Sequence, residues 1–351
     1  MPFCFCRSHR LSTKTLTLST KIRPWLIAEV VVVLLSLGLA EVFARGLHLD
    51  RAVGVLCLAS LASLLVSARL GGRQALVGVA SLAVLSVPAV FSQRDPLLAT
   101  TVLSVTALGL GLSARWQLKP VYWFLVVSLC ILITSSPLPP DPAPLEVVRL
   151  AIGLFGSGSG AVLLQSKLVS RFEGAPLPVP FAVVHSWRRS GAHALMLASA
   201  AVVSTPIALQ HHWHTSGLWL ILTPFLVMQP VVKDSWRVAL HRSLGTLAGV
   251  VLVIGLALAL PPSVPLQLPA IAAALITVLI AVKKGHRALM ITTFTVTIVL
   301  FNSRIDTLLV MADQRVLASG LGIAIALGLM ALAHPIEHRF RRMNQRIAPH
   351  S

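Results

Sequence analysis

The stretch WLILTPFLVMQPVVKDSWRVALHRSLGTLAGVVLVIGLALALP, residues Trp219–Pro261, decides the fold. Two apolar runs flank a short basic turn, and neither run has the period-two alternation that a strand of a membrane barrel requires. The first run ends at Gln229-Pro230, and the second opens at Arg242 with small residues at helical spacing, Gly245, Thr246 and Gly249. This pattern predicts two membrane helices joined by a basic turn.

The composition of the whole chain extends this prediction to an all-α integral membrane protein. Hydrophobic residues make up 56% of the 351 residues, charged residues only 11%, and the mean hydropathy is +0.85. Soluble domains carry about 25% charged residues, so this chain has too little polar surface to cover a soluble fold. We expect no sizeable soluble domain.

The apolar runs predict about twelve transmembrane helices, because about 20 apolar residues cross a hydrocarbon core. The expected spans are Trp25–Phe43, Val53–Val66, Ala75–Phe91, Leu97–Leu112, Val121–Thr134, Leu145–Leu164, His193–Leu209, Leu218–Met228, Leu244–Leu260, Leu266–Val282, Ala288–Phe301 and Val316–Ala333. Several are short, so flanking residues must extend them or the true count is lower.

The distribution of Lys and Arg residues supports this count. If both termini are cytoplasmic, 23 of the 29 Lys and Arg residues fall in cytoplasmic segments, in the direction of the positive-inside rule. The outside set is Arg45, Arg51, Arg94, Arg149, Arg304 and Arg315. The net charge of +18 then reflects loops that orient helices and lie against anionic membrane lipid, rather than a nucleic-acid-binding surface.

Internal similarity predicts two six-helix halves. Glu146 and Arg149 open the sixth span, Asp313 and Arg315 open the twelfth, and a glycine-containing stretch follows each pair. An even number of spans per half gives both halves the same orientation, hence a parallel repeat. The expected organisation is a basic cytoplasmic tail (1–24), a first membrane half (25–164), a Pro-rich cytoplasmic linker (165–190), a second membrane half (191–333) and a basic cytoplasmic tail (334–351).

The residues of the second half carry a family resemblance. An alanine-rich helix HALMLASAAVV begins at His193, Trp219 leads a helix that ends at Gln229-Pro230, and an Arg–Gly-Thr helix follows from Arg242. This order resembles the FUSC family, the fusaric-acid-resistance and aromatic-acid-exporter group of membrane proteins. The resemblance covers about 190–333, and Met196 stands where members often place an arginine. It implies export of small organic anions, while related plant malate channels imply passive conduction.

Ionisable residues within or beside the spans are the transport candidates, because each costs about 2.5 kcal/mol or more in a bilayer. Glu29 is either a proton-coupling carboxylate or an interfacial acid beside Arg23 or Lys21. The two acid–arginine pairs predict interhelical ties or an anion-attracting vestibule. The basic turn contributes Lys233, Arg237 and Arg242, which either gather anions at a cytoplasmic mouth or simply orient the helices, and Gln229-Pro230 is either a broken helix at membrane depth or a simple stop.

Glycines at helical spacing predict close helix packing, because small residues let backbones approach in lipid. The candidates are Gly156, Gly160, Gly245, Thr246, Gly249, Gly320 and Gly322.

The sequence shows no nucleotide fingerprint and no catalytic constellation, so we expect neither an enzyme nor a cofactor. The run His211, His212, Trp213 and His214 has the ligand count for a metal but no supporting residues, and we assign no metal site. The interpretation is a bacterial inner-membrane exporter of small organic anions, with proton coupling left open. The alternatives are a passive anion channel and a non-transport scaffold or accessory subunit. Expected partners are the anion, membrane lipid and either a second copy or a periplasmic accessory protein, and no nucleic acid.

Overall fold

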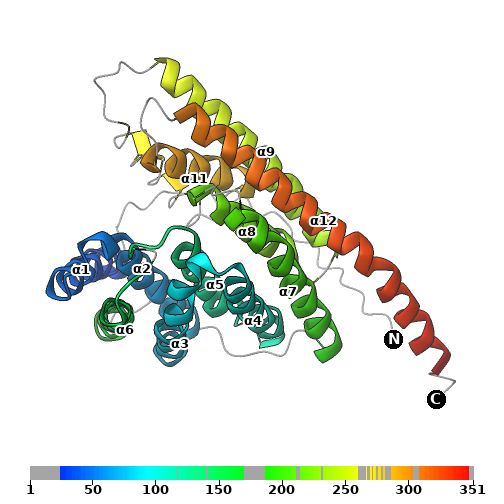
Figure 1. Ribbon diagram of the computed structural model, residues 1–351, viewed down its shortest axis with the longest axis horizontal. Helices are drawn as coiled ribbons and strands as arrows, with labels where there is room; N and C mark the ends of the chain where they lie inside the picture. The colour runs from blue at the N-terminus through cyan, green and yellow to red at the C-terminus, as the bar shows by residue number, and fades with distance from the viewer. Residues whose placement is uncertain are drawn as a thin grey trace, which may run out of the picture.

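Helices make up the described fold (Figure 1). The computed structural model describes residues 24–116, 118–139, 141–169, 186–210, 214–230, 232–259, 286–302 and 308–347, together with several positions between 266 and 280. No strand occurs among these residues, which confirms the all-α prediction for them. Of the run His211, His212, Trp213 and His214, the first three residues lie outside the described residues.

Six helices form the first half of the chain. They are α1 (Pro24–Gly46), α2 (Val53–Leu70), α3 (Gly72–Phe91), α4 (Pro96–Ser113), α5 (Lys119–Thr134) and α6 (Pro144–Leu164). Short 3-10 turns η1 (Asp50–Ala52), η2 (Ser92–Arg94) and η3 (Ala114–Trp116) precede or follow them, and the π-helical segment η4 (Gln165–Val169) continues α6. At the start of α4, the Asp95 carboxylate accepts hydrogen bonds from the N–H groups of Leu97 and Leu98, which caps the helix.

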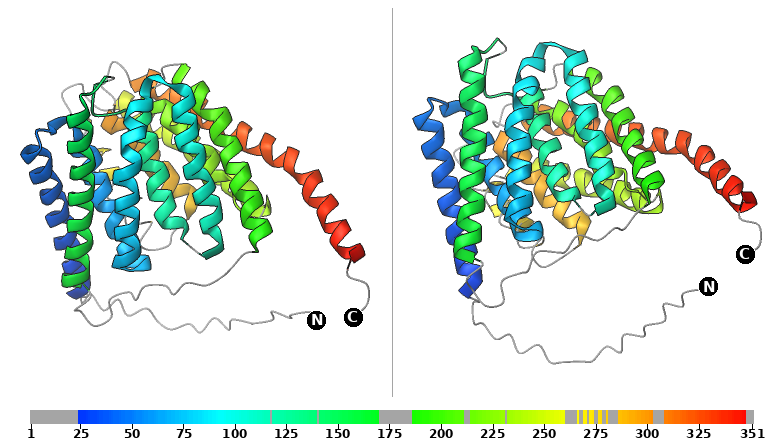
Figure 2. Two further views of the ribbon diagram at one scale, coloured as in Figure 1. Left: turned by 60° about the horizontal axis from the view of Figure 1, so that its bottom comes forward. Right: turned by 90° about the horizontal axis from the view of Figure 1, so that it is seen from below.

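The second half contributes five described helices. They are α7 (Trp187–Gln210), α8 (His214–Val227), α9 (Val232–Ala259), α11 (Arg287–Asn302) and α12 (Leu308–Ile347). Helix α12 has 40 residues and continues beyond the expected end of the last span at Ala333. Figure 2 shows its C-terminal part leaving the body of the molecule. Most of the segment expected as a C-terminal tail therefore continues this helix.

The number of candidate membrane spans is lower than twelve among the described residues. Eight helices are long and apolar enough to cross a membrane, and three shorter apolar helices accompany them, Phe124–Thr134, Ser216–Val227 and Ala288–Thr297. The expected span Leu266–Val282 lies largely outside the described residues. The chain is thus an all-helical integral membrane protein with eight candidate spans in its described part.

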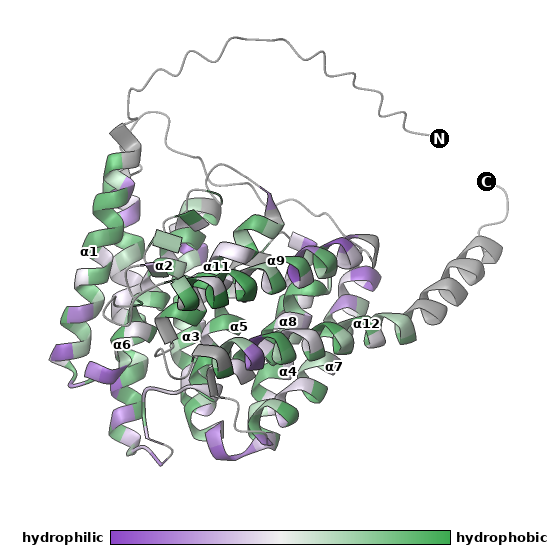
Figure 3. Cartoon of the chain, turned by 90° about the horizontal axis from the view of Figure 1, so that it is seen from above, coloured by the Kyte–Doolittle hydropathy of each residue, from purple (hydrophilic) through white to green (hydrophobic). Residues whose placement is uncertain are grey.

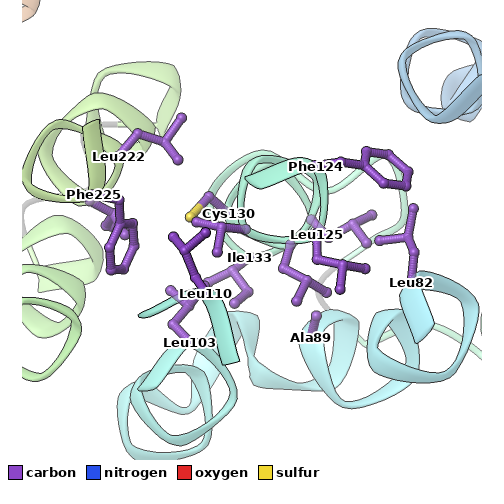
Figure 4. Packing of buried hydrophobic residues seen from close by; sticks show 14 of the residues in the cluster. Leu82, Ala89, Leu103, Leu110, Phe124, Leu125, Cys130, Ile133, Leu222 and Phe225 are labelled. Carbon is purple, nitrogen blue, oxygen red and sulfur yellow. The ribbon is translucent and has the colours of Figure 1, made fainter. Parts of the chain in front are cut away.

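The packing around α5 explains how this short apolar helix is accommodated in the fold. Figure 4 shows Leu125, Cys130 and Ile133 of α5 with buried side chains of α3, α4 and α8 around them. A helix that is apolar on all sides is buried within protein rather than exposed on one face to water. Helix α5 therefore need not match the full bilayer thickness by itself, since its neighbours surround it.

The helices on both sides of the linker pack in corresponding pairs. In the first half α1 contacts α2 and α6, α6 contacts α2 and α3, and α3 contacts α5. In the second half α7 contacts α8 and α12, α12 contacts α8 and α9, and α9 contacts α11. Between the halves α4 packs along α7, and Gly111 of α4 touches the backbone of Ala194 of α7.

The surface of the described helices is predominantly apolar. Figure 3 shows hydrophobic residues along most of the helices and hydrophilic residues mainly near their ends. Large apolar side chains such as Leu34, Val84 and Leu258 are exposed, which suits contact with lipid rather than water.

Candidate functional site

A hydrogen-bonded turn joins α8 to α9, two of the helices that form the candidate site. Helix α8 ends at Val227, and the backbone N–H of Gln229 donates to Ser235 Oγ at 2.8 Å, within the first turns of α9. The side-chain amide of Gln229 donates to the Leu226 carbonyl at 2.9 Å. Gln229 and Pro230 therefore form a hydrogen-bonded turn between the two helices, and both side chains are partly buried.

A stacked arginine and tryptophan lie at the centre of the site. The guanidinium carbon of Arg315, on α12, lies 3.2 Å from the centroid of the Trp219 ring, on α8. Both residues are buried, with 3% and 6% of their surfaces exposed. An arginine over an indole face is attracted by the ring quadrupole and stacks on it with its planar fork. The edge of Phe294 from α11 meets the same indole at 5.9 Å between ring centroids.

A second arginine approaches the same indole from α9. The guanidinium carbon of Arg242 lies 5.7 Å from the Trp219 ring centroid, and Arg242 is 5% exposed. Its Nε and Nη2 both donate to Thr223 Oγ1, at 3.3 and 3.1 Å. Thr223 is one turn after Trp219 on α8, so α8 supplies both the ring and the hydroxyl that orient this guanidinium.

No carboxylate compensates the two guanidinium groups among the described residues. The ion pairs in this part of the chain are Arg45 with Glu41 and Arg94 with Asp141, both on exposed surface. The Nε and Nη1 atoms of Arg315 are buried and lack a hydrogen-bond partner. A buried charge without a partner is strongly destabilising, so the cluster of Trp219, Thr223, Arg242 and Arg315 is suited to bind an anion. We call these four residues the arginine site.

Close helix contacts bring the arginine site together. A Cβ at Gly322 of α12 would lie 2.7 Å from Thr223 Cβ and 3.0 Å from the Leu220 carbonyl oxygen of α8. A Cβ at Gly245 would lie 2.8 Å from the Ala288 carbonyl oxygen, and one at Gly249 would lie 2.9 Å from the Thr292 carbonyl oxygen. Thr246 is buried between these two glycines on α9. Backbones this close leave no space for larger residues at these positions.

The remaining residues of the basic turn and of the second acid–arginine pair lie apart from the site. Arg237 and Asp313 are exposed, and the side chain of Lys233 lies outside the described residues. Arg242 had been counted among cytoplasmic residues, but it is buried within the candidate span Asp234–Leu256. The positive-inside count was therefore wrong about Arg242, because its position on α9 turns its side chain onto α8.

Candidates of the first half form separate contacts. Glu29 on α1 accepts a hydrogen bond from Gln165 Nε2 at 3.0 Å, which joins the start of α1 to the end of α6. Glu146 Oε2 accepts from the backbone N–H of Ala143 at 3.3 Å, so it caps its own helix. Arg149 is partly buried, and no ion pair joins it to Glu146 in the described structure.

The glycines of α6 lie against α1, and Gly320 does not lie against another helix. A Cβ at Gly156 would collide with the Phe43 ring, and one at Gly160 would collide with the Leu39 side chain. Gly320 is exposed, and a Cβ there would meet nothing within 4 Å.

Sequence reasoning missed the parts of the arginine site that come from α8. Trp219 was used only as a marker of the helix start, and Thr223 was not selected. The available signal was their spacing: residues four apart lie on one face of a helix, so a tryptophan and a threonine at 219 and 223 could serve one ligand or one arginine. Among the described residues no cluster of His, Cys, Asp and Glu could hold a metal ion.

Comparison with known protein families gives a match in the part of the chain that contains the arginine site. A family model described as fusaric acid resistance protein-like matches residues 194–329. The matched region includes Trp219, Thr223, Arg242 and Arg315, and it confirms the family resemblance expected from the sequence. No curated protein and no solved structure matches the chain.

Proposed function

We propose that the protein exports small organic anions, because residues 194–329 match the family model described as fusaric acid resistance protein-like. Aromatic carboxylic acids are the proposed substrates, and the bacterial inner membrane, with both chain termini in the cytoplasm, is the proposed location. Transport, rather than catalysis, is the activity associated with this family.

The arginine site is the observation that supports an anionic substrate. Two guanidinium groups lie around one buried indole, and Arg315 has two buried nitrogen atoms without a hydrogen-bond partner. Arginine presents a planar fork of N–H donors that fits a carboxylate through two parallel hydrogen bonds. A bound carboxylate would supply both the missing acceptor and negative charge.

The surroundings of the arginine site favour a carboxylate attached to an apolar or aromatic body. Trp219 and Phe294 provide aromatic surface beside the guanidinium groups, with ring centroids 5.9 Å apart. The hydroxyl of Thr223 is already an acceptor for Arg242, whereas the guanidinium of Arg315 has two buried nitrogen atoms without a hydrogen-bond partner among the described residues. We propose that Arg315 donates hydrogen bonds to the substrate carboxylate and that Arg242, oriented by Thr223, supplies the second positive charge beside it.

We also propose that the two membrane halves are a parallel repeat. The corresponding helix pairs of the two halves, such as α2 with α6 and α8 with α12, support this proposal. A parallel repeat requires the α5–α6 and α11–α12 loops to face the same side of the membrane. Cysteines introduced as Ala143→Cys and Ser303→Cys should react with an impermeant maleimide from the same side, and labelling from opposite sides would reject the repeat.

Flux through purified protein in liposomes tests the proposed function. Radiolabelled benzoate and 4-hydroxybenzoate should cross the membrane with the wild-type protein, and Arg315→Gln or Arg242→Gln should lower the flux at least about tenfold, the effect of about 1.4 kcal/mol. Arg237→Gln, an exposed position on α9, is the matched control and should change the flux less than about twofold. Size-exclusion profiles show whether each variant is folded.

An imposed pH gradient then separates the mechanisms. Uphill movement that depends on the gradient establishes proton-coupled export, whereas downhill movement alone establishes a passive anion channel. Equal flux in wild type and both arginine variants would overturn the assignment of the arginine site.

A further inference from the structure

A cavity of about 540 Å³ lies apart from the arginine site, between the start of α2 and the end of α5. Its wall comes from Arg51 of η1, from Gly54 and Val55 at the start of α2, and from Ser135, Ser136 and Leu138 in the loop after α5, among others. Its volume is within the range of about 300–1,000 Å³ that is typical of small-molecule sites. None of its lining residues belongs to the arginine site.

The polar groups of this cavity suit a single anionic group. Arg51 is the charged residue of its lining. Ser136 Oγ accepts from the Leu138 N–H at 3.2 Å, which leaves its own hydroxyl hydrogen free to donate. A Cβ at Gly54, in the first turn of α2, would meet nothing within 4 Å, so the backbone there borders open space.

The rest of the cavity wall is apolar. Val55 and Leu58 of α2 face Ile131 of α5, and two prolines, Pro137 and Pro139, complete the wall from the loop. Prolines have a fixed φ angle, so this wall loses little conformational entropy when a ligand binds. An arginine and a hydroxyl group beside apolar surface are complementary to a carboxylate with a hydrocarbon or aromatic body.

We propose that this cavity is a second binding site for a small apolar carboxylate, on the external side of the membrane. Arg51 binds the carboxylate, the Ser136 hydroxyl donates to it, and the apolar wall holds the body. The external location rests on the proposed orientation with both termini in the cytoplasm, in which Arg51 belongs to the outside set. The site is independent of the direction of transport, because it would bind an external carboxylate in an exporter and in a channel alike.

Protection of an introduced cysteine tests this site directly. Gly54→Cys, a lining position with room for a side chain, is made in a chain in which Cys4 and Cys6 are replaced by Ser, and the parent chain gives the background from Cys57 and Cys130. Intact cells are treated with a membrane-impermeant maleimide in the presence or absence of millimolar benzoate. We expect benzoate to slow labelling of the cysteine at least about threefold, and benzyl alcohol, which has the same ring without a carboxylate, to have no effect.

Three further variants decide between specific and general effects. Arg51→Gln should abolish the protection by benzoate, whereas the double variant Arg242→Gln, Arg315→Gln should keep it, which separates this cavity from the arginine site. Ala143→Cys, an exposed position outside the cavity lining, should be labelled at the same rate with and without benzoate.

The proposal is overturned if benzoate gives no protection, if it protects equally after Arg51→Gln, or if it slows labelling at Ala143→Cys to the same extent. Labelling of Gly54→Cys only in inside-out vesicles would overturn the external location. Because the readout is labelling and not flux, a failure here leaves the proposed transport function standing.

Discussion

The guanidinium carbon of Arg315, on α12, lies over the ring of Trp219, on α8, at 3.2 Å from the ring centroid. The contact joins the end of the chain to a helix nearly a hundred residues earlier. The guanidinium carbon of Arg242, on α9, lies 5.7 Å from the centroid of the same ring. One indole ring is therefore close to two positively charged groups from two other helices. Removal of the ring should therefore disturb both.

Substitution of Trp219 should separate the role of the ring from that of general packing. Trp219→Leu fills most of the space but removes the aromatic face, and we expect benzoate flux to fall about fivefold or more, because cation–π contacts contribute about 1–2 kcal/mol when desolvated. Trp219→Phe keeps an aromatic face and should retain flux within about threefold. Equal losses in the two variants would show that size, and not the aromatic face, matters.

Replacement of Arg315 by an apolar residue should stabilise the empty protein and abolish its response to ligand. Arg315→Met removes a buried charge that has no acid partner among the described residues, and replacement even of a complete buried ion pair by apolar residues is often stabilising by about 1–4 kcal/mol. We expect the midpoint of thermal aggregation, measured at one heating rate, to rise by a few degrees.

Wild type should gain stability from benzoate by mass action, whereas Arg315→Met should gain none. A lower midpoint for the empty Arg315→Met protein would contradict the view that this charge is uncompensated.

Two glycines on α12 provide a matched pair for helix packing. Gly322→Ala should destabilise the protein by about 1–3 kcal/mol, because its Cβ would lie 2.7 Å from Thr223 Cβ and 3.0 Å from a backbone oxygen. Gly320→Ala should be neutral or slightly stabilising, because its Cβ meets nothing within 4 Å. Thermal midpoints and flux should both fall in the first variant alone, and the same loss in both would indicate a general effect on α12.

Glu29 offers a test of coupling that does not involve the arginine site. If its carboxylate carries the coupled proton, Glu29→Gln should remove the dependence of flux on the pH gradient while downhill flux continues. The amide keeps an acceptor for Gln165 Nε2, which donates at 3.0 Å in the wild type, so the contact between α1 and the end of α6 should survive. An unchanged response to the gradient would leave Glu29 as an interfacial acid.

The sequence singled out two of the four residues of the arginine site, Arg242 and Arg315, but not their association. Arg242 had been grouped with Lys233 and Arg237 in a basic turn, and Arg315 with Asp313 in an acid–arginine pair. Spacing along one helix can show which residues share a face, but not which neighbouring helix meets that face. The contacts of α8 with α9 and α12 depend on tertiary packing, so the shared indole could not be inferred.

The apolar runs predicted the existence of the helices better than their ends. Hydropathy marks where a helix is apolar, but α12 continues to Ile347 through a basic sequence in which helix propensity and not hydropathy applies. The number of membrane spans could not be predicted from hydropathy for a related reason. Helix α5 is short and surrounded by protein, and its length alone does not show whether it crosses the membrane.

The contact of Gly111 with the backbone of Ala194 limits how the two halves can move. At this point the backbones of α4 and α7 are in contact, and no space remains even for a methyl group. The two helices therefore cannot come closer together here, and no larger side chain fits between them. If a substrate is exposed to the two sides of the membrane in turn, the two halves would have to rotate relative to each other about the contact between α4 and α7. Spin labels placed across α4 and α7 should keep a constant separation during turnover, while distances between the outer helices α1 and α9 should change.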